Sequence, residues 1–225
     1  MYIYKLIKQI LSVNWLVSCF LNFYYLNFRK AIRFPILIGY GVKIGYLGNR
    51  RSINVSNRFG ALCFALKDGP FALRGKSFWY IGDNAKIKIC GTARFSKGTN
   101  LKLFANSELF IGDKFTSNAN LIISCAKKII IGDDCLIGWN VTIMDNDGGH
   151  TVKQNGRIRN APREIVIGKH VWLSAKATVL KGSIIPDNSV VGYGSNVCGI
   201  NVIEKNSVIV GNPAEVRLIG MEWNH

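Results

Sequence analysis

Aliphatic residues return at every sixth position through the C-terminal part of the chain. The longest run consists of Ile167, Leu173, Val179, Ile185, Val191, Val197, Ile203 and Ile209. A second run with the same spacing is Ile131, Ile137 and Ile143, and earlier units begin at Ile38, Ile81, Ile87 and Ile111. A period of six fits neither an α-helix, whose period is 3.6, nor a hairpin meander, whose turns come every 8–12 residues.

This period predicts a triangular solenoid in which each hexapeptide forms one flat side of a coil. One aliphatic side chain per side then points to the axis and stacks on the same side of the next coil. Small residues recur four positions after the aliphatic one, where a corner leaves little room: Ala85, Ala177, Ser189, Ser195 and Ser207. Gly-Asp-Asn and Gly-Asp-Asp segments suit turns that need a positive φ. We therefore predict an all-β chain folded as a parallel β-helix.

The first 35 residues depart from this pattern. No charge occurs from Gln9 to Phe28, a length that would just span a bilayer, but serine and asparagine interrupt the stretch and no small-residue cleavage site follows. The flanking residues are Lys5, Lys8, Arg29, Lys30 and Arg33, and the stretch contains Trp15, Tyr24 and Tyr25, residue types that favour membrane interfaces. We expect a helical segment that either docks on the domain or a neighbouring subunit, or lies on a membrane surface.

Composition narrows the classes of partner. The chain has 48% hydrophobic and 19% charged residues, which excludes a disordered protein, and its formal net charge is +16. Such a surface attracts polyanions, but the basic residues are spread out and no nucleic-acid-binding motif accompanies them, so we expect no nucleic-acid partner. The six cysteines form no C-x-x-C pair and no Cys/His cluster with zinc spacing, which indicates a reduced, cytoplasmic protein without a metal.

The strict period breaks once in the C-terminal half, between Ile143 and Ile167. The intervening segment is polar, rich in glycine and without a repeat of its own, and a long loop in a regular solenoid is usually functional. It contains His150, one of three histidines in the chain. An imidazole is suited to act as a base near neutral pH. His170, in a turn position of a hexapeptide, and the terminal His225 are weaker candidates.

The tandem [LIV]-G-x-x-[AVS]-x units resemble the hexapeptide-repeat acyltransferases over roughly residues 36–218. The resemblance implies a left-handed parallel β-helix, usually a homotrimer, that uses acyl-CoA or, in one branch, acyl carrier protein. The segment FPILIGYGVKIG after a basic, aromatic N-terminus looks like bacterial enzymes that decorate surface polysaccharides. We accordingly divide the chain into a helical segment 1–35, a β-helix domain 36–218 with an active-site loop 145–164, and a tail 219–225.

The same resemblance assigns roles around the loop. In galactoside, maltose and virginiamycin-type acetyltransferases a matching loop follows an I-x-x-N-V-T coil, here Ile137–Thr142, and carries the catalytic histidine. His150 would then deprotonate the acceptor hydroxyl, which attacks the thioester directly, while backbone amides stabilise the oxyanion. Trp139 and Asn140 would contact the substrate. Asp145 and Asp147 are equal candidates to hold the imidazole, since D-N-D-G-G-H is one residue longer than the D-x-D-x-H of many relatives. Binding of acceptor hydroxyls, or simple solvation, is the alternative for both.

The resemblance also places the donor along the later coils. Trp172 would lie near the active site and Ser174 near the pantetheine arm, with Tyr193, Gly194 and Cys198 along the arm or the adenine end. The segment Val210–Ala214 resembles the family's G-x-P-A signature, after which a basic residue usually approaches the coenzyme phosphates. Glu215 occupies that place here, so Lys205 and Arg217 are proposed substitutes.

The sequence therefore predicts a cytoplasmic O-acetyltransferase, in one interpretation at the inner face of the membrane. Acetyl-CoA would be the donor, and a sugar hydroxyl of a glycan or polysaccharide precursor the acceptor. The enzymatic alternative is N-acetylation of an amino sugar on a nucleotide or lipid carrier. The non-enzymatic alternatives are a solenoid scaffold and a membrane-surface or polyanion-binding module. The carbonic-anhydrase-like relatives need three metal-binding histidines, and the three here have the wrong spacing.

Overall fold

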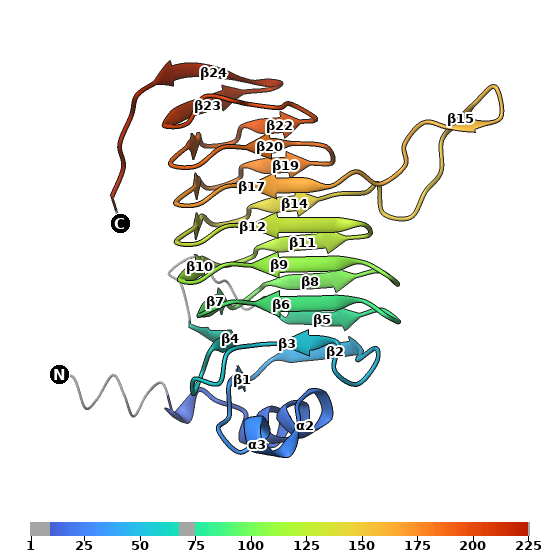
Figure 1. Cartoon of the computed structure of the whole chain (residues 1–225), viewed down its shortest axis with the longest axis vertical. Coiled ribbons are helices and arrows are strands. Elements are labelled where there is room, and N and C mark those ends of the chain that lie inside the picture. The colour runs from blue at the N-terminus through green and yellow to red at the C-terminus, as the bar shows by residue number, and fades with distance from the viewer. Residues whose placement is uncertain (1–9, 68–74, 225) are drawn as a thin grey trace.

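The computed structural model describes residues 10–67 and 75–224 (Figure 1), and the predicted roles of Lys5, Lys8, Gln9 and His225 lie outside these residues. The described chain winds repeatedly through three parallel sheets, which we call faces 1, 2 and 3 in the order in which the chain meets them. Face 1 contains β1 (Ile36–Ile38), β4 (Leu62–Lys67), β7 (Ala93–Ser96), β10 (Phe115–Ser117), β13 (Leu136–Ile137), β18 (Trp172–Leu173), β21 (Val190–Val191), β23 (Ser207–Gly211) and β24 (Ala214–Ile219). The prediction of a left-handed parallel β-helix is confirmed.

The other two faces complete each coil. Face 2 contains β2 (Val42–Tyr46), β5 (Ser77–Ile81), β8 (Asn100–Leu103), β11 (Ile122–Cys125), β14 (Thr142–Met144), β19 (Thr178–Leu180) and β22 (Asn196–Cys198). Face 3 contains β3 (Ile53–Asn54), β6 (Lys86–Ile89), β9 (Glu108–Ile111), β12 (Lys128–Ile131), β17 (Ile165–Ile167) and β20 (Ile184–Ile185). The corners between faces are named 1–2, 2–3 and 3–1.

The core is a set of vertical stacks of aliphatic side chains. Parallel pairing places Ile123 beside Ile143, Ile143 beside Val179, and Val179 beside Val197 in one such stack on face 2. All four side chains are buried. Asn84 and Asp134, in the predicted turns, have positive φ values of 56° and 59°. Burial of one aliphatic residue per side is the driving force that fixes the register, because a slip of one residue would turn every stack outward.

The prediction is wrong for one residue of the six-residue run. Ile203 was expected to point inward, yet it is 78% exposed, while the neighbouring Val202 is 6% exposed and takes the buried place. This segment lies at the end of the solenoid, where Ile184 pairs with Asn201 only as an isolated bridge. With no full strand above it to hold the register, the third side of the last coil shifts by one residue.

Both ends of the solenoid are covered. At one end lie the helices α2 (Trp15–Tyr25) and α3 (Phe28–Ala31), and at the other β24 folds back antiparallel on β23 (Figure 1). Open strand edges invite pairing with other chains, so such caps are required in a solenoid. Neither helix of the described residues is long and apolar enough to pass through a bilayer.

Polar side chains of α2 satisfy the open edge of β1. Asn22 accepts a hydrogen bond from the Ile36 amide at 3.1 Å and donates one to the Ile36 carbonyl at 2.7 Å. Ser18 accepts from the Ile38 amide at 2.9 Å, and the Asn14 amide donates to the Ile38 carbonyl at 2.8 Å. Ser18 and Asn22, two of the polar residues that interrupt the apolar N-terminal stretch, therefore take the place of a missing strand.

Candidate functional site

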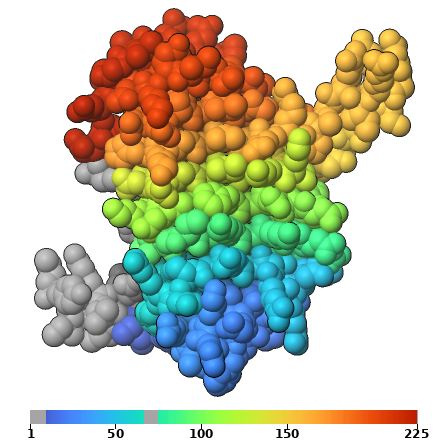
Figure 2. Space-filling view, in the orientation of Figure 1, coloured from blue at the N-terminus to red at the C-terminus, as the bar shows by residue number. Residues whose placement is uncertain are grey.

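The long loop leaves the solenoid at corner 2–3, between β14 and β17. It projects far from the coils and carries the short hairpin β15 (Lys153–Gln154) and β16 (Arg157–Ile158), as Figures 1 and 2 show. The same corner is also wider in the coils below. Leu101 pairs with Ile123, a step of 22 residues, whereas Val179 pairs with Val197, a step of 18. The loop thus lies at a corner that is already widened in the coils below it.

Asp145 anchors the start of the loop. Its side chain is fully buried, and its carboxylate accepts hydrogen bonds from the backbone amides of Ala126, Lys127 and Lys128 at 2.6, 2.7 and 2.8 Å. These amides lie at corner 2–3 of the coil below. The chain leaves the solenoid above this corner to form the loop, so no strand there offers carbonyl groups to the amides. A buried carboxylate with three such donors replaces the missing ladder. We conclude that Asp145 holds the loop in place through backbone contacts.

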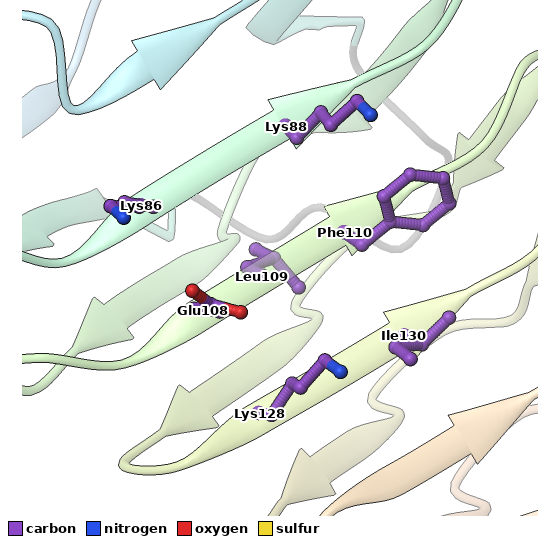
Figure 3. Close-up of a pocket in the computed structure, with 7 residues that line it drawn as sticks. All are labelled: Lys86, Lys88, Glu108, Leu109, Phe110, Lys128 and Ile130. Carbon is purple, nitrogen blue, oxygen red and sulfur yellow. The ribbon is translucent and has the colours of Figure 1, made fainter.

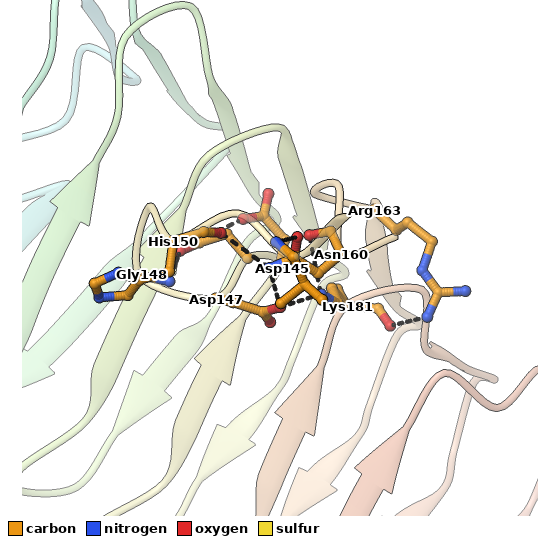
Figure 4. Close-up of polar contacts among 9 residues, drawn as sticks. Asp145, Asp147, Gly148, His150, Asn160, Arg163 and Lys181 are labelled. Atoms are coloured by element: carbon orange, nitrogen blue, oxygen red, sulfur yellow. Dashed lines mark hydrogen bonds and ion pairs between the residues drawn. The ribbon is translucent and has the colours of Figure 1, made fainter. Parts of the chain in front are cut away.

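A second cluster closes the neck of the loop (Figure 4). The Asn160 side chain donates to the Asp147 carboxylate and to the His150 carbonyl, both at 2.9 Å. Lys181, on the coil above, contacts Asp147 at 2.5 Å and the Asn160 carbonyl at 3.1 Å. The hydrogen bond from Lys181, followed by that from Asn160, holds the pKa of Asp147 below its usual value.

The imidazole of His150 points away from this cluster (Figure 4). Its backbone is held by Asn160, but its side chain is exposed, and among the described residues none is within hydrogen-bonding distance of its ring nitrogens. Asp145 and Asp147, predicted as partners of the ring, bind backbone amides and Lys181 instead. The triad-like contact expected for them is therefore not present in the single chain, because both carboxylates are used to shape the loop.

Aromatic and basic side chains continue from the loop down face 2. A Cβ placed on Gly149 would lie 3.9 Å from Cε1 of Phe104, so this part of the loop lies next to the ring. Lys102 lies over Phe104 at 4.3 Å and over Tyr80 at 5.7 Å, and the Tyr80 ring packs at 5.6 Å from that of Tyr46. We call Tyr46, Tyr80, Lys102 and Phe104 the aromatic strip. It forms a partly exposed surface that begins beside the loop.

A different corner gathers several of the residues predicted to bind substrate and donor. Trp139 and Asn140 lie between β13 and β14, hence at corner 1–2, and Ser174, Tyr193 and Gly194 follow at the same corner in the coils above. Lys176, which the sequence did not single out, lies 5.4 Å from the Tyr193 ring. A column of turn backbone with an aromatic ring and a cation is suited to an extended, phosphorylated ligand. Face 2 separates this column from His150.

The remaining predicted donor residues are dispersed. Trp172 projects from face 1, and Cys198 lies exposed on face 2. Lys205 pairs with Asp187 at 2.9 Å toward corner 3–1, and Arg217 pairs with Glu215 at 3.6 Å on β24. Within one chain these four do not converge with the column at corner 1–2.

His170 is held by the C-terminal tail. Its Nδ1 lies 2.8 Å from Asp134 and its Nε2 lies 3.0 Å from the Trp223 carbonyl, while the Trp223 ring stacks on the imidazole with centroids 4.1 Å apart. The contact with the Trp223 carbonyl, together with the Asp134 carboxylate, raises the pKa of His170 above its usual value. The trend favours a charged imidazole that fastens the tail.

Face 3 carries a shallow basic hollow below the point where the loop returns (Figure 3). It is lined by Lys86, Lys88, Glu108, Leu109, Phe110, Lys128 and Ile130 and has a volume of about 410 Å³. Lys128 at its rim pairs with Glu164 at 3.3 Å, and so ties the hollow to the end of the loop. Within residues 10–67 and 75–224, no group of His, Cys, Asp and Glu side chains is arranged to hold a metal ion.

Several residues that shape the site were missed by the sequence reasoning. Lys181 and Asn160 belong to no motif, and their roles depend on contacts across 34 and 13 residues to Asp147. Phe104 is one of 12 phenylalanines in the chain, and nothing in the sequence distinguishes it from the others. The six-residue spacing gives no signal at this point, because Ile87 and Ile111 are 24 residues apart, a multiple of six.

No sequence model of a protein family matches the chain. Individual proteins do. Galactoside O-acetyltransferase of Escherichia coli (strain K12) is 34% identical over 141 residues, which is 62% of this chain and 63% of that protein. The putative lipopolysaccharide biosynthesis O-acetyl transferase WbbJ of the same organism is 34% identical over 147 residues, 61% of this chain and 74% of that protein. The match thus spans less than two thirds of the galactoside enzyme and nearly three quarters of WbbJ.

Among solved structures, the polysialic acid O-acetyltransferase OatWY is similar. The two chains superpose with a TM-score of 0.55 at 29% sequence identity, covering 67% of this chain and 72% of that one. OatWY is thus similar in three dimensions, as the two Escherichia coli proteins are in sequence.

Proposed function

The chain belongs to the hexapeptide-repeat acetyltransferases, and from this membership we propose that it transfers an acetyl group from acetyl-CoA to a sugar hydroxyl of a glycan or polysaccharide precursor. The observation that carries the proposal is the loop at corner 2–3, whose neck is fastened by buried and ionic contacts while the His150 ring stays exposed and uncommitted. The names of the similar proteins, which are O-acetyltransferases of galactosides, lipopolysaccharide and polysialic acid, support the choice of reaction and of acceptor class.

In the proposed reaction, His150 acts as the general base. Its imidazole takes the proton of the acceptor hydroxyl as the oxygen attacks the thioester carbonyl, and the same proton passes to the leaving thiolate of coenzyme A. The oxygen–carbon bond forms and the carbon–sulfur bond breaks, so an acetyl ester and free coenzyme A result. No covalent enzyme intermediate is needed. Asp147 and Asn160 act on this step only by holding the backbone of His150.

We propose that the donor lies along the column at corner 1–2 and the acceptor along the aromatic strip. Turn backbone, Ser174, Tyr193 and Lys176 suit the amides and phosphates of the donor, whereas sugar rings pack well on faces such as Phe104 and Tyr80. The strip starts at the loop, so a sugar resting on Phe104 would lie near His150.

We further propose a homotrimer, because the donor column and His150 of one chain lie on different corners. A second subunit that brings its own corner 1–2 against the loop would complete the site. The hairpin β15–β16 supports this arrangement, since Val152 and Ile158 are exposed apolar residues on a projecting element. We also propose that the reaction takes place in the cytoplasm, where acetyl-CoA is available.

The test is product analysis with the full chain. Purified protein is incubated with isotopically labelled acetyl-CoA and a panel of surface-polysaccharide oligosaccharides, and products are identified by mass spectrometry. We expect one labelled acetyl group that mild alkali removes, as an ester requires. A label stable to alkali would instead establish N-acetylation of an amino sugar, and absence of any coenzyme A binding by calorimetry would point to a scaffold.

A further inference from the structure

The outer side of the N-terminal cap is apolar, which is unusual for a surface helix. The side of α2 that faces the solenoid contains Leu21 and Tyr25 together with the polar Ser18 and Asn22, and all four are buried. The outer side contains Leu16, which is 85% exposed, with Phe20 and Phe23 also exposed. A helix in contact only with water places its polar residues outward, so this arrangement indicates that the outer side has an apolar partner.

The exposed apolar residues extend beyond α2 into one continuous stretch of chain. They are Ile10, Leu11, Trp15, Leu16, Phe20, Phe23, Phe28 and Ile32. We call this set the cap face. It lies at the end of the solenoid, where α2 and α3 form the outermost layer (Figures 1 and 2). A partner that covers the cap face would therefore not cover faces 1, 2 and 3 or the loop.

Charge identifies the kind of partner. Residues 1–67 include ten lysine and arginine residues and no aspartate or glutamate. Arg29 and Arg33 are exposed within the helical segment, and Lys43, Arg50 and Arg51 are exposed in the first coil beside it. Two such caps would repel one another, which disfavours a second copy of the chain as the partner. Apolar and aromatic side chains with a basic surround match an anionic lipid surface.

We propose that the cap face docks on the surface of an anionic phospholipid bilayer. The side chains of Leu16, Phe20 and Phe28 enter the boundary between headgroups and acyl chains, while Arg29 and Arg33 contact lipid phosphates. The helices lie in the plane of the interface and do not cross it. Insertion into the lipid boundary does not leave the backbone groups of β1 without partners, because Asn22 and Ser18 already bind them.

Docking in this way would set the height of the active-site loop. The loop leaves the coil of β13 and β14, four coils above the coil of β1 and β2. Strands in a sheet are about 4.8 Å apart and a helix layer is about 10 Å thick, so the loop would stand roughly 30 Å above the bilayer surface. This step rests on the proposed function, and it names the acceptor as a glycan still attached to a membrane lipid.

Vesicle binding tests the docking without any need for activity. The full chain is sedimented with vesicles of pure phosphatidylcholine or of phosphatidylcholine with about 30% phosphatidylglycerol. We expect binding to the anionic vesicles alone. The triple variant Leu16→Gln, Phe20→Gln, Phe28→Gln should bind at least tenfold more weakly, and Arg29→Gln with Arg33→Gln should remove most of the preference for anionic lipid.

A matched control comes from the opposite end of the solenoid. Ile203, Leu218 and Ile219 are equally exposed apolar residues there, and their replacement by glutamine should leave vesicle binding unchanged. Circular dichroism confirms that each variant is folded. Equal binding by the cap variant and the control variant would overturn the proposal. If sedimentation velocity shows that the cap variant forms smaller assemblies than the wild type, the cap face joins protein chains instead. If the wild-type chain retains RNA through this face, the face is a nucleic-acid surface.

The acceptor class is tested separately. The rate of acetyl transfer to a lipid-anchored glycan in anionic vesicles is compared with that to the same glycan released from its anchor. We expect the wild-type chain to favour the anchored form at least tenfold and the cap variant to lose this preference while it keeps its rate on the released form. No preference by the wild type would refute the lipid-attached acceptor, and no transfer to either form would refute the proposed function while leaving the vesicle result intact.

Discussion

His150 precedes strand β17 and His170 follows it, so the two histidines lie at neighbouring corners of the solenoid. The imidazole of His170 is bonded at both nitrogens, to Asp134 and to the Trp223 carbonyl, and is covered by the Trp223 ring. The imidazole of His150 is exposed, while the backbone around it is fastened by Asn160 and Lys181. A histidine with both nitrogens occupied serves as a fastening, and one with free nitrogens on a fixed backbone is available for proton transfer.

The largest effect should separate the two histidines by activity. We expect His150→Ala to lower kcat by about 10² to 10⁴-fold, the usual contribution of a general base, and His170→Ala to leave most of it. Steady-state release of coenzyme A gives the rates, and calorimetry should show unchanged coenzyme binding in both variants. Full turnover by the His150→Ala protein would remove the proposed base.

The next effect concerns the two aspartates near His150, of which one is buried and the other is exposed. Asp145 is buried with three amide donors, so Asp145→Asn should lower the free energy of unfolding by about 1–3 kcal/mol, because an amide presents an N–H group to one of them. Asp147 is exposed, and Asp147→Asn should cost less than about 1 kcal/mol. Urea unfolding measures both, and equal losses would contradict the assignment of Asp145.

A smaller effect is expected on the aromatic strip. Phe104→Ala and Lys102→Ala should each raise the KM for the acceptor by about five- to tenfold, equivalent to roughly 1 kcal/mol of lost contact, without changing the KM for the donor. Lys88 provides the matched control, since it also lies over a ring, that of Phe110 at 5.6 Å, but on face 3. If Lys88→Ala has the same effect, the acceptor does not follow the strip.

The smallest effect is a pH dependence of the C-terminal tail. The native pKa of His170 is raised, so its charged contacts stabilise the tail fully below the ordinary histidine value of about 6.5 and are lost as the pH rises through the higher native value. Acrylamide quenching of Trp223, taken as the difference from a Trp223→Phe variant, should increase over that range. The step should be absent in His170→Asn, and the activity attributed to His150 should not follow it.

Part of the site could be read from the chain and part could not. The break in the repeat between Ile143 and Ile167 located the loop and its histidine, because a missing hexapeptide is a local property of the sequence. The partners of Asp145 and Asp147 could not be found in this way. The partners of Asp145 are backbone amides 17 to 19 residues before it, and one partner of Asp147 is Lys181, 34 residues after it. They meet the aspartates only when the coils stack.

The N-terminal stretch shows the same division. Its apolar character and flanking basic residues were plain from the sequence, but it could either dock on the domain or a subunit, or lie on a membrane surface. The contacts of Ser18 and Asn22 with β1 show which side of α2 docks on the solenoid, and they leave Leu16 and Phe20 on the outside. The direction in which each face of a helix points depends on its partner, which periodicity does not name.

By itself, the sequence determined the β-helix, its phase along most of its length and the place where it opens into a loop, since burial of one aliphatic residue per side is a repeating, short-range requirement. The tertiary structure decided which carboxylates build the loop, which histidine is occupied, which corners hold the candidate donor and acceptor residues, and which face of the cap is exposed. These outcomes depend on residues brought together from successive coils, and the spacing of aliphatic residues carries no information about them.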